Sequence, residues 1–133
     1  MMEYKYIDPQ ELRKWWVSVK PGLEKIKSSS PESWIIEDVY TDCFNQKSLL
    51  FVGIENSRYL GFFILQPLAE TTHVWAGYSV ENSYDIVKNA LEFIKGMARQ
   101  ANVKNITFSS HRRGWAKRAK AYGFRPNKWI CEV

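Results

Sequence analysis

The chain has 133 residues, of which 45% are hydrophobic and 15% aromatic, and it carries 19 Lys and Arg against 14 Asp and Glu. This length predicts a single domain, residues 1–133, that folds without a disulfide or a structural metal, and this composition excludes a disordered chain. The longest apolar run, residues 59–65, is too short to span a membrane. The first residues lack the apolar core of a signal peptide, so we predict a cytoplasmic location.

The N-terminal third predicts a short strand followed by two helices. Residues 4–7 read as the strand, and Asp8-Pro9 then marks a helix start, with a capping side chain before a proline. Pro21-Gly22 predicts the end of this helix, and the polar residues 22–33 predict a loop. A second helix, predicted to open at Pro31-Glu32, places Ile35, Ile36, Val39, Tyr40 and Cys43 on its apolar side.

The hydrophobic period then changes to that of strands. Residues 48–55, 58–68 and 73–80 are apolar, β-branched and aromatic runs, and Asn56-Ser57 between the first two suits a tight hairpin turn. Residues 70–72 make a second turn. These signals predict an antiparallel meander of three strands.

The C-terminal half predicts a long helix, a strand, a helix and a last strand. The long helix, residues 81–103, has an apolar stripe of Val87, Ala90, Leu91, Ile94, Met97, Ala98 and Ala101. Residues 105–110 predict a strand parallel to 73–80, reached by a right-handed crossover. The next helix ends at Gly123, and residues 127–133 predict a closing strand. The fold class is therefore α/β, a mixed, mostly antiparallel sheet with helices on both faces.

The two cysteines indicate neither a disulfide scaffold nor a metal site. Cys43 and Cys131 lack metal-type spacing and predict buried free thiols, so we expect no metal site.

Residues 111–128 hold seven Lys and Arg without one Asp or Glu, while the rest of the chain has 12 Lys and Arg against 14 Asp and Glu. This basic stretch predicts a solvated helix face, a contact to a phosphate of a cofactor, or a nucleic-acid contact; the last is not favoured, because the remaining surface is net negative.

The order of elements resembles the GNAT superfamily of N-acetyltransferases over nearly the whole chain. The likeness rests mainly on the long helix ending "MARQANVKNITF" and on the later helix ending in Gly123-Phe124 before a last strand. It implies a single GNAT-like domain that transfers an acetyl group from acetyl-CoA to an unidentified amine. The chain also resembles, less specifically, small internal virion proteins of short-tailed phages that keep this fold, which implies a virion location instead.

The resemblance implies where acetyl-CoA would bind. The cofactor would lie where strands 73–80 and 105–110 splay apart, with its pantetheine arm against the backbone of the fourth strand and its pyrophosphate at the start of the long helix. The implied cofactor-binding residues are Ala76, Gly77, Tyr78, Ser79, Asn82, Ser83, Tyr84, Asp85, Ser110, Arg113 and Lys117. The acceptor amine would enter beside the first two helices, which carry Trp15, Trp16 and Trp34.

Two motif positions depart from the family. The family signature Gln/Arg-x-x-Gly-x-Gly/Ala meets Asn82, Asp85 and Val87 here, and no glycine occurs between Gly77 and Gly96. Asp85 would bring a carboxylate beside the diphosphate. The tyrosine that often protonates the leaving thiolate is replaced by Ala119, which leaves Tyr122 as the nearest phenol.

The candidate catalytic residues are Tyr122 as acid, His111 after the central strand, where a catalytic group could face the thioester, and Glu70 before the fourth strand as a base. Each has a plainer interpretation, as a core phenol, a helix-capping histidine and a solvated turn charge. Two functions stay open at this point. One is a GNAT-like N-acyltransferase; the other is an inert GNAT-fold virion or binding protein that acts through its Trp-rich helices or its basic helix.

Overall fold

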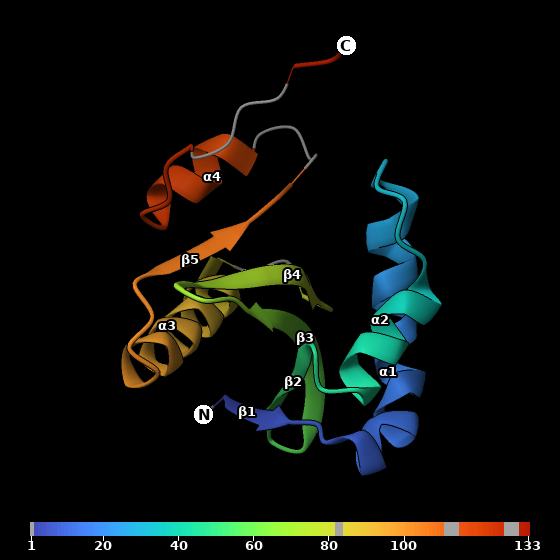
Figure 1. Ribbon diagram of the computed structural model, residues 1–133. Coiled ribbons are helices and arrows are strands. Elements are labelled where there is room, and N and C mark those ends of the chain that lie inside the picture. Colours follow the sequence, from blue (N-terminus) through green and yellow to red (C-terminus); the bar gives the residue numbers. More distant parts are fainter. Residues whose placement is uncertain (1, 82–83, 111–114, 127–130) are drawn as a thin grey trace.

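The computed structural model describes residues 2–81, 84–110, 115–126 and 131–133, and within these ranges it forms one five-stranded sheet flanked by helices (Figure 1). The predicted order of elements is confirmed as far as the helix that precedes Gly123. The elements are β1 (Glu3–Tyr6), α1 (Pro9–Ser28), α2 (Ile36–Phe44), β2 (Leu49–Glu55), β3 (Arg58–Pro67), β4 (Thr71–Ser79), α3 (Tyr84–Gln100), β5 (Asn105–Phe108) and α4 (Trp115–Ala121).

The sheet has the strand order β1-β2-β3-β4-β5, and the pairs are antiparallel except β4 with β5, which is parallel. The predicted meander and the predicted parallel pair are therefore confirmed. Asn56 and Ser57 both have positive φ, 52° and 63°, which is the conformation of a type I′ hairpin turn. This turn follows the right-handed twist of the strands it joins.

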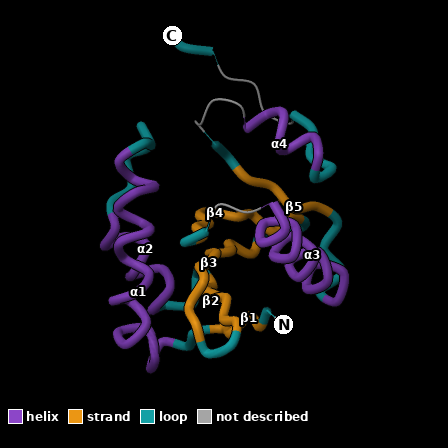
Figure 2. Tube along the Cα trace, turned by 180° about the vertical axis from the view of Figure 1, so that it is seen from behind, coloured by secondary structure: helices purple, strands orange, loops and turns teal. Residues whose placement is uncertain are grey.

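Helices cover both faces of the sheet, as the sequence predicts. Figures 1 and 2 show α1 and α2 on one face and α3 on the other. Two buried clusters result, because side chains alternate between the faces along each strand. Phe62, Ile64 and Ala76 pack beneath α1 and α2, whereas Phe63 and Leu65 pack with Ile94 of α3.

The first helix begins as predicted and ends later than predicted. Asp8 Oδ1 accepts hydrogen bonds from the backbone N–H groups of Gln10 (2.9 Å) and Glu11 (3.1 Å), so the predicted N-cap is confirmed. The predicted end at Pro21-Gly22 is wrong, because α1 continues to Ser28. Pro21 is exposed and so is Val17 before it, so water can reach the carbonyl that proline leaves without a helical donor. Burial of the next turn of α1 against the sheet offsets the remaining cost.

The connection between α1 and α2 is shorter than predicted and comprises residues 29–35. The second helix begins at Ile36, so the predicted start at Pro31-Glu32 is wrong. The Asp38 side chain accepts a hydrogen bond from the backbone N–H of Ile35 at 2.9 Å, which satisfies one donor at the helix start. This bond fixes the helix start five residues after Pro31.

The third helix is apolar toward the sheet, although its stripe differs in two positions from the prediction. Phe93 belongs to the buried side and its ring lies 4.7 Å from that of Tyr4, whereas Ala101 lies beyond the helix and is exposed. The aromatic contact joins β1 at one edge of the sheet to α3. It is a long-range pairing that helical periodicity alone does not reveal.

The last described helix, α4, packs through aromatic side chains. Phe108 of β5 makes edge-on contacts with Trp115 (5.5 Å between ring centroids) and Phe124 (4.7 Å). Gly123 has φ +91°, so the predicted left-handed helix end is confirmed. Of the predicted closing strand, residues 127–130 lie outside the described ranges, and residues 131–133 form no strand. None of the described helices is long and apolar enough to cross a membrane.

The two cysteines differ in exposure, so the prediction that both are buried is wrong for Cys131. Cys43 is buried, and burial raises the pKa of its thiol to about 12, while Cys131 is exposed. Only a thiolate reacts readily with alkylating agents. At pH 8 we therefore expect iodoacetamide to label Cys131 and to spare Cys43, as measured by peptide mass spectrometry. Denatured protein, in which both thiols should react, is the control, and rapid labelling of Cys43 in the native protein would contradict the described packing.

Candidate functional site

The outer half of β4 has an open edge on the side of β5. Residues 71–74 of β4 pair with residues 105–108 of β5, and β4 then runs on through Trp75–Ser79. No described residue pairs with that part of β4 on this side, although β3 pairs with it on the other. Figure 1 shows the two strands diverging beyond their short ladder. Backbone N–H and C=O groups of this open edge are therefore oriented toward the space between the strands.

A β-bulge lies where the open edge begins. Ile64 pairs with Ala76 while Leu65 pairs with Val74, so Trp75 is an extra residue on β4. As a result Trp75 and Ala76 both pack against the cluster beneath α1 and α2, and Val74 packs against the α3 side. The bulge thus turns the Trp75 indole toward the face of the sheet that α1 and α2 cover.

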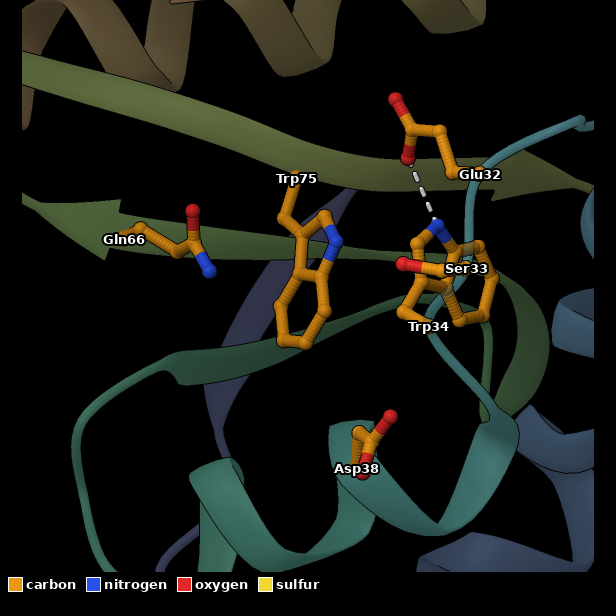
Figure 3. Close-up of a pocket in the computed structure, with 6 residues that line it drawn as sticks. All are labelled: Glu32, Ser33, Trp34, Asp38, Gln66 and Trp75. Atoms are coloured by element: carbon orange, nitrogen blue, oxygen red, sulfur yellow. Dashed lines mark hydrogen bonds between the residues drawn. The ribbon is translucent and has the colours of Figure 1, made fainter.

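Beside the bulge lies an open hollow of about 640 Å³, which we call the Trp hollow (Figure 3). It lies between the connection that precedes α2, the start of α2, and strands β3 and β4. Its lining residues are Glu32, Ser33, Trp34, Asp38, Gln66 and Trp75. The two indoles meet edge to face, with ring centroids 6.0 Å apart and planes at 71°.

Both carboxylates of the Trp hollow are held by the chain. Trp34 Nε1 donates a hydrogen bond to Glu32 Oε2 at 2.7 Å, and the backbone N–H of Ile35 donates to Asp38 Oδ2 at 2.9 Å. In Figure 3 the two carboxylates lie on opposite sides of the pair of indoles. The Lys27 ammonium lies 5.0 Å over the Trp34 ring and donates to the Glu32 carbonyl oxygen. The hollow is therefore aromatic at its centre, with a carboxylate on each of two sides and one ammonium group of the chain over Trp34.

Tyr78 extends the same face toward the outer end of the open edge. Its ring packs on Phe62 and against Gly22 of α1, where an added Cβ would lie 2.7 Å from Tyr78 Cδ2. Its hydroxyl oxygen accepts a hydrogen bond from Lys25 Nζ at 3.3 Å. The phenol is thus held between the sheet and α1, with an ammonium at its oxygen.

The structure brings four of the residues expected to bind the cofactor onto the open edge, namely Ala76, Gly77, Tyr78 and Ser79. Gly77 is exposed there, with room around it. Asn82 and Ser83 lie outside the described residues, Tyr84 begins α3, and Asp85 is exposed in the first turn of that helix. The roles of these residues in binding stay predictions.

Further candidates come from the C-terminal part of the chain. Ser110 is exposed after β5, and Lys117 is exposed on α4, while Arg113 and His111 lie outside the described residues. Arg118, on the same helix, lies 5.0 Å from the Trp115 ring centroid, so one cation of the basic stretch packs on the protein itself.

The two described catalytic candidates lie apart from the Trp hollow. Tyr122 is buried directly after α4 and borders a small cavity of about 140 Å³ against Lys88, Glu92 and Lys95 of α3. Glu70 is exposed in the turn before β4, and about 13 Å of strand separates the start of β4 from Trp75. The structure does not bring Tyr122 or Glu70 to the hollow, and their catalytic roles stay predictions.

The sequence placed Trp34 on a helix expected to border the acceptor side, and it did not single out the other residues of the hollow. Trp75 reads as an ordinary strand residue, because a bulge becomes visible only when the partner strand is known. Glu32 and Asp38 were not assigned to a site, because the second helix was predicted to start at Pro31. The spacing of Trp34 and Asp38, four residues apart around a helix start, is the sequence signal that could have indicated the hollow.

No protein-family model and no curated protein sequence matches the chain. Solved structures do match along its full length. One is a predicted acetyltransferase with acetyl-CoA from Clostridium acetobutylicum, with TM-score 0.69 and 15% identity, covering 100% of this chain and 96% of that one. The chain has the fold of the GNAT acetyltransferases.

Other structures with the GNAT fold match equally well. A ribosomal-protein-alanine N-acetyltransferase from Brucella melitensis has TM-score 0.72 and 12% identity, covering 100% of this chain and 98% of that one. An aminoglycoside acetyltransferase from an uncultured soil metagenomic sample, in complex with sisomicin, has TM-score 0.73 and 10% identity, covering 99% and 93%. At these identities the likeness establishes the GNAT fold of this chain and nothing finer.

Proposed function

We propose that this protein is an N-acetyltransferase that transfers the acetyl group of acetyl-CoA to an amine. The observation that carries the proposal is the open edge of β4, where the β5 side of Trp75–Ser79 has no strand partner among the described residues, while β3 pairs with the other side. An extended chain bearing amide groups, such as the pantetheine arm of CoA, can hydrogen-bond to such an edge as a strand would. Several solved structures with this fold contain acetyl-CoA or CoA, which supports the choice of cosubstrate.

The described residues fit the pantetheine arm well and the pyrophosphate poorly. Gly77 is exposed on the open edge, and a side-chain carbon added to it would have no neighbour closer than 3.9 Å, so backbone approach is unobstructed. At the start of α3, in contrast, the Asp85 carboxylate is exposed near the helix end that would receive the phosphates. A carboxylate there competes with a phosphate for the positive end of the helix dipole.

Acetyl-CoA would supply an acetyl thioester, and the chain would position it and the amine. The amine nitrogen, after losing its proton, would form a bond to the carbonyl carbon as the bond from that carbon to sulfur breaks, and the thiolate would take up a proton. The Trp hollow lies on the α1 and α2 face beside the inner end of the open edge. An acceptor held in it would approach the thioester from the face opposite α3.

The proposal is tested by thermal shift and calorimetry with acetyl-CoA. Binding raises the melting temperature of the protein by mass action, and we expect a saturable shift. No shift at millimolar acetyl-CoA would overturn the enzymatic function. It would favour the second candidate, a GNAT-fold binding or virion protein, which the missing glycine signature around Asp85 and Val87 supports.

Removing the Asp85 carboxylate should strengthen the binding of acetyl-CoA. For Asp85→Gly, and for the charge-only change Asp85→Asn, we expect an affinity about threefold to tenfold higher, because an exposed like charge near a diphosphate costs on the order of 1 kcal/mol. Calorimetry on each variant measures the effect. Glu92→Gln, which removes an exposed carboxylate two turns along α3, is the matched control. An unchanged affinity in both Asp85 variants would show that the pyrophosphate does not bind at the start of α3.

A further inference from the structure

The Trp hollow has a composition that selects one kind of amine. It adjoins Trp75, the first residue of β4 beyond the β5 ladder, so a molecule in it lies next to the place where the thioester would be held under the proposed function. Its centre is formed by two indoles in contact, and its sides by two carboxylates. Among the described residues no Lys or Arg lines it, although the Lys27 ammonium lies 5.0 Å over the Trp34 ring.

The indoles favour a cation. The face of a tryptophan ring attracts an ammonium group electrostatically, and this attraction survives partial exposure to water. The chain itself uses this property, since Lys27 Nζ lies 5.0 Å over the Trp34 ring. The Trp75 ring stands edge to face against Trp34 and presents a second aromatic surface within the same hollow.

The carboxylates favour more than one positive charge. A hydrogen bond from Trp34 Nε1 holds the Glu32 carboxylate, and one from the Ile35 N–H holds that of Asp38. A ligand therefore does not have to order either side chain. They lie on opposite sides of the indoles (Figure 3), and one ammonium group cannot neutralise both. Both are exposed, so each contact is individually weak, and selection depends on using them together.

We propose that the acceptor is a small compound with two or more amino groups, and this inference rests on the proposed function. An amine attacks a thioester only after it has lost its proton, and a neutral amine gains little from a carboxylate or an indole. The compound would bind with its amino groups protonated, near the two carboxylates. Once the reacting nitrogen has lost its proton, a second ammonium group would still be held by one carboxylate and the indoles. The first nitrogen would then form its bond to the acetyl carbon as described above, while the held ammonium group remains unchanged.

Calorimetry in the absence of acetyl-CoA tests this selection with three probes of equal length, 1,5-diaminopentane, pentylamine and 1,5-pentanediol, at low ionic strength. We expect the diamine to bind at least about tenfold more tightly than the monoamine, and the diol to give no binding heat. Equal affinities for the diamine and the monoamine would overturn the inference.

Variants locate the binding within the chain. Glu32→Gln and Asp38→Asn keep the size of the side chain and one acceptor oxygen but remove the charge, and each should weaken binding of the diamine about threefold or more. Trp75→Leu should weaken this binding by a similar factor. Glu37→Gln, an exposed neighbour on α2 that does not line the hollow, is the matched control and should change nothing. If Glu37→Gln weakens binding as much as Asp38→Asn, the attraction belongs to a general acidic surface and the inference is wrong.

The same protein sample separates this inference from the proposed function. Binding of acetyl-CoA without selection for the diamine overturns the acceptor class and leaves the acetyltransferase proposal intact. Binding of the diamine without binding of acetyl-CoA overturns the acetyltransferase proposal, and with it the role of the Trp hollow as an acceptor site.

Discussion

Gly61→Ala is expected to lower the free energy of unfolding by about 3 kcal/mol. Gly61 pairs with Ser79 at the outer end of β4 and has φ +159°. A Cβ added there would lie 2.2 Å from the backbone oxygen of Tyr78 and 3.0 Å from the Ser79 Cα. Since both obstacles are backbone atoms of the paired strand, they can withdraw only if the β3–β4 ladder opens locally. Urea denaturation followed by circular dichroism measures the loss.

Gly77→Ala provides the matched control for this substitution. Gly77 lies on the neighbouring strand, and its nearest neighbours would be the Phe62 oxygen at 3.9 Å and the Phe63 Cβ at 4.0 Å, which is ordinary contact. We expect its unfolding free energy to stay within about 1 kcal/mol of that of the parent protein. A similar loss in both variants would show that the close contact at Gly61 is not the cause.

Gly22→Ala should also destabilise the protein, by about 1–2 kcal/mol. Alanine is favoured over glycine in a helix interior by about 1 kcal/mol, but a misfitting carbon in a packed core costs about 1–3 kcal/mol. Here the added Cβ would lie 2.7 Å from Tyr78 Cδ2 and 2.8 Å from Phe62 Cε1, both atoms of packed rings. We expect the packing cost to exceed the gain in helix propensity, as measured by the same denaturation experiment.

Gly96→Ala measures the gain in helix propensity without a packing cost. Gly96 lies in α3, and nothing comes within 4 Å of an added Cβ. Alanine there should raise the unfolding free energy by up to about 1 kcal/mol. Effects of opposite sign at the two helical glycines support the close approach of α1 to the sheet; stabilisation by both substitutions would contradict it.

The two glycines at which we expect losses act on the same segment. Because Gly22 has no Cβ, the Tyr78 ring can pack against α1, and because Gly61 has none, the Tyr78 backbone can lie close to β3. Together they define where the outer half of β4 lies, and therefore where its open edge is presented. Substitutions at either position should therefore lower the affinity of any ligand that binds this edge by more than the loss of folding stability alone explains.

Much of the fold follows from local sequence, because its signals are local. The apolar runs of the meander and the left-handed residues Asn56 and Gly123 each determine a structure within a few residues. The error at Pro21-Gly22 has a tertiary cause. Locally this pair indicates a helix end, yet Gly22 is required where the helix meets Tyr78 and Phe62, and that contact joins segments more than 35 residues apart.

The candidate site was less predictable than the fold. Trp34 could be assigned to the acceptor side from its place in the element order, but Trp75 could not, because its direction depends on a change of register against β3. The same applies to Glu32 and Asp38, which face the indoles only once the path of residues 29–35 is fixed. Surfaces assembled from loops and irregular strands depend on contacts that no single segment encodes.

The bulge at Trp75 also affects how this chain must be aligned with distant relatives. Val74 faces α3, whereas Ala76 and Tyr78 face α1 and α2, so the usual alternation is offset by one residue across the bulge. An ungapped alignment with a chain that lacks the bulge would match residues of opposite faces at every later position of β4, whereas deleting the extra residue would leave each later residue on its own face. Between chains that share this fold at 15% identity or less, equivalent residues of β4 are therefore identified by their ladder partners on β3 and not by counting along the strand.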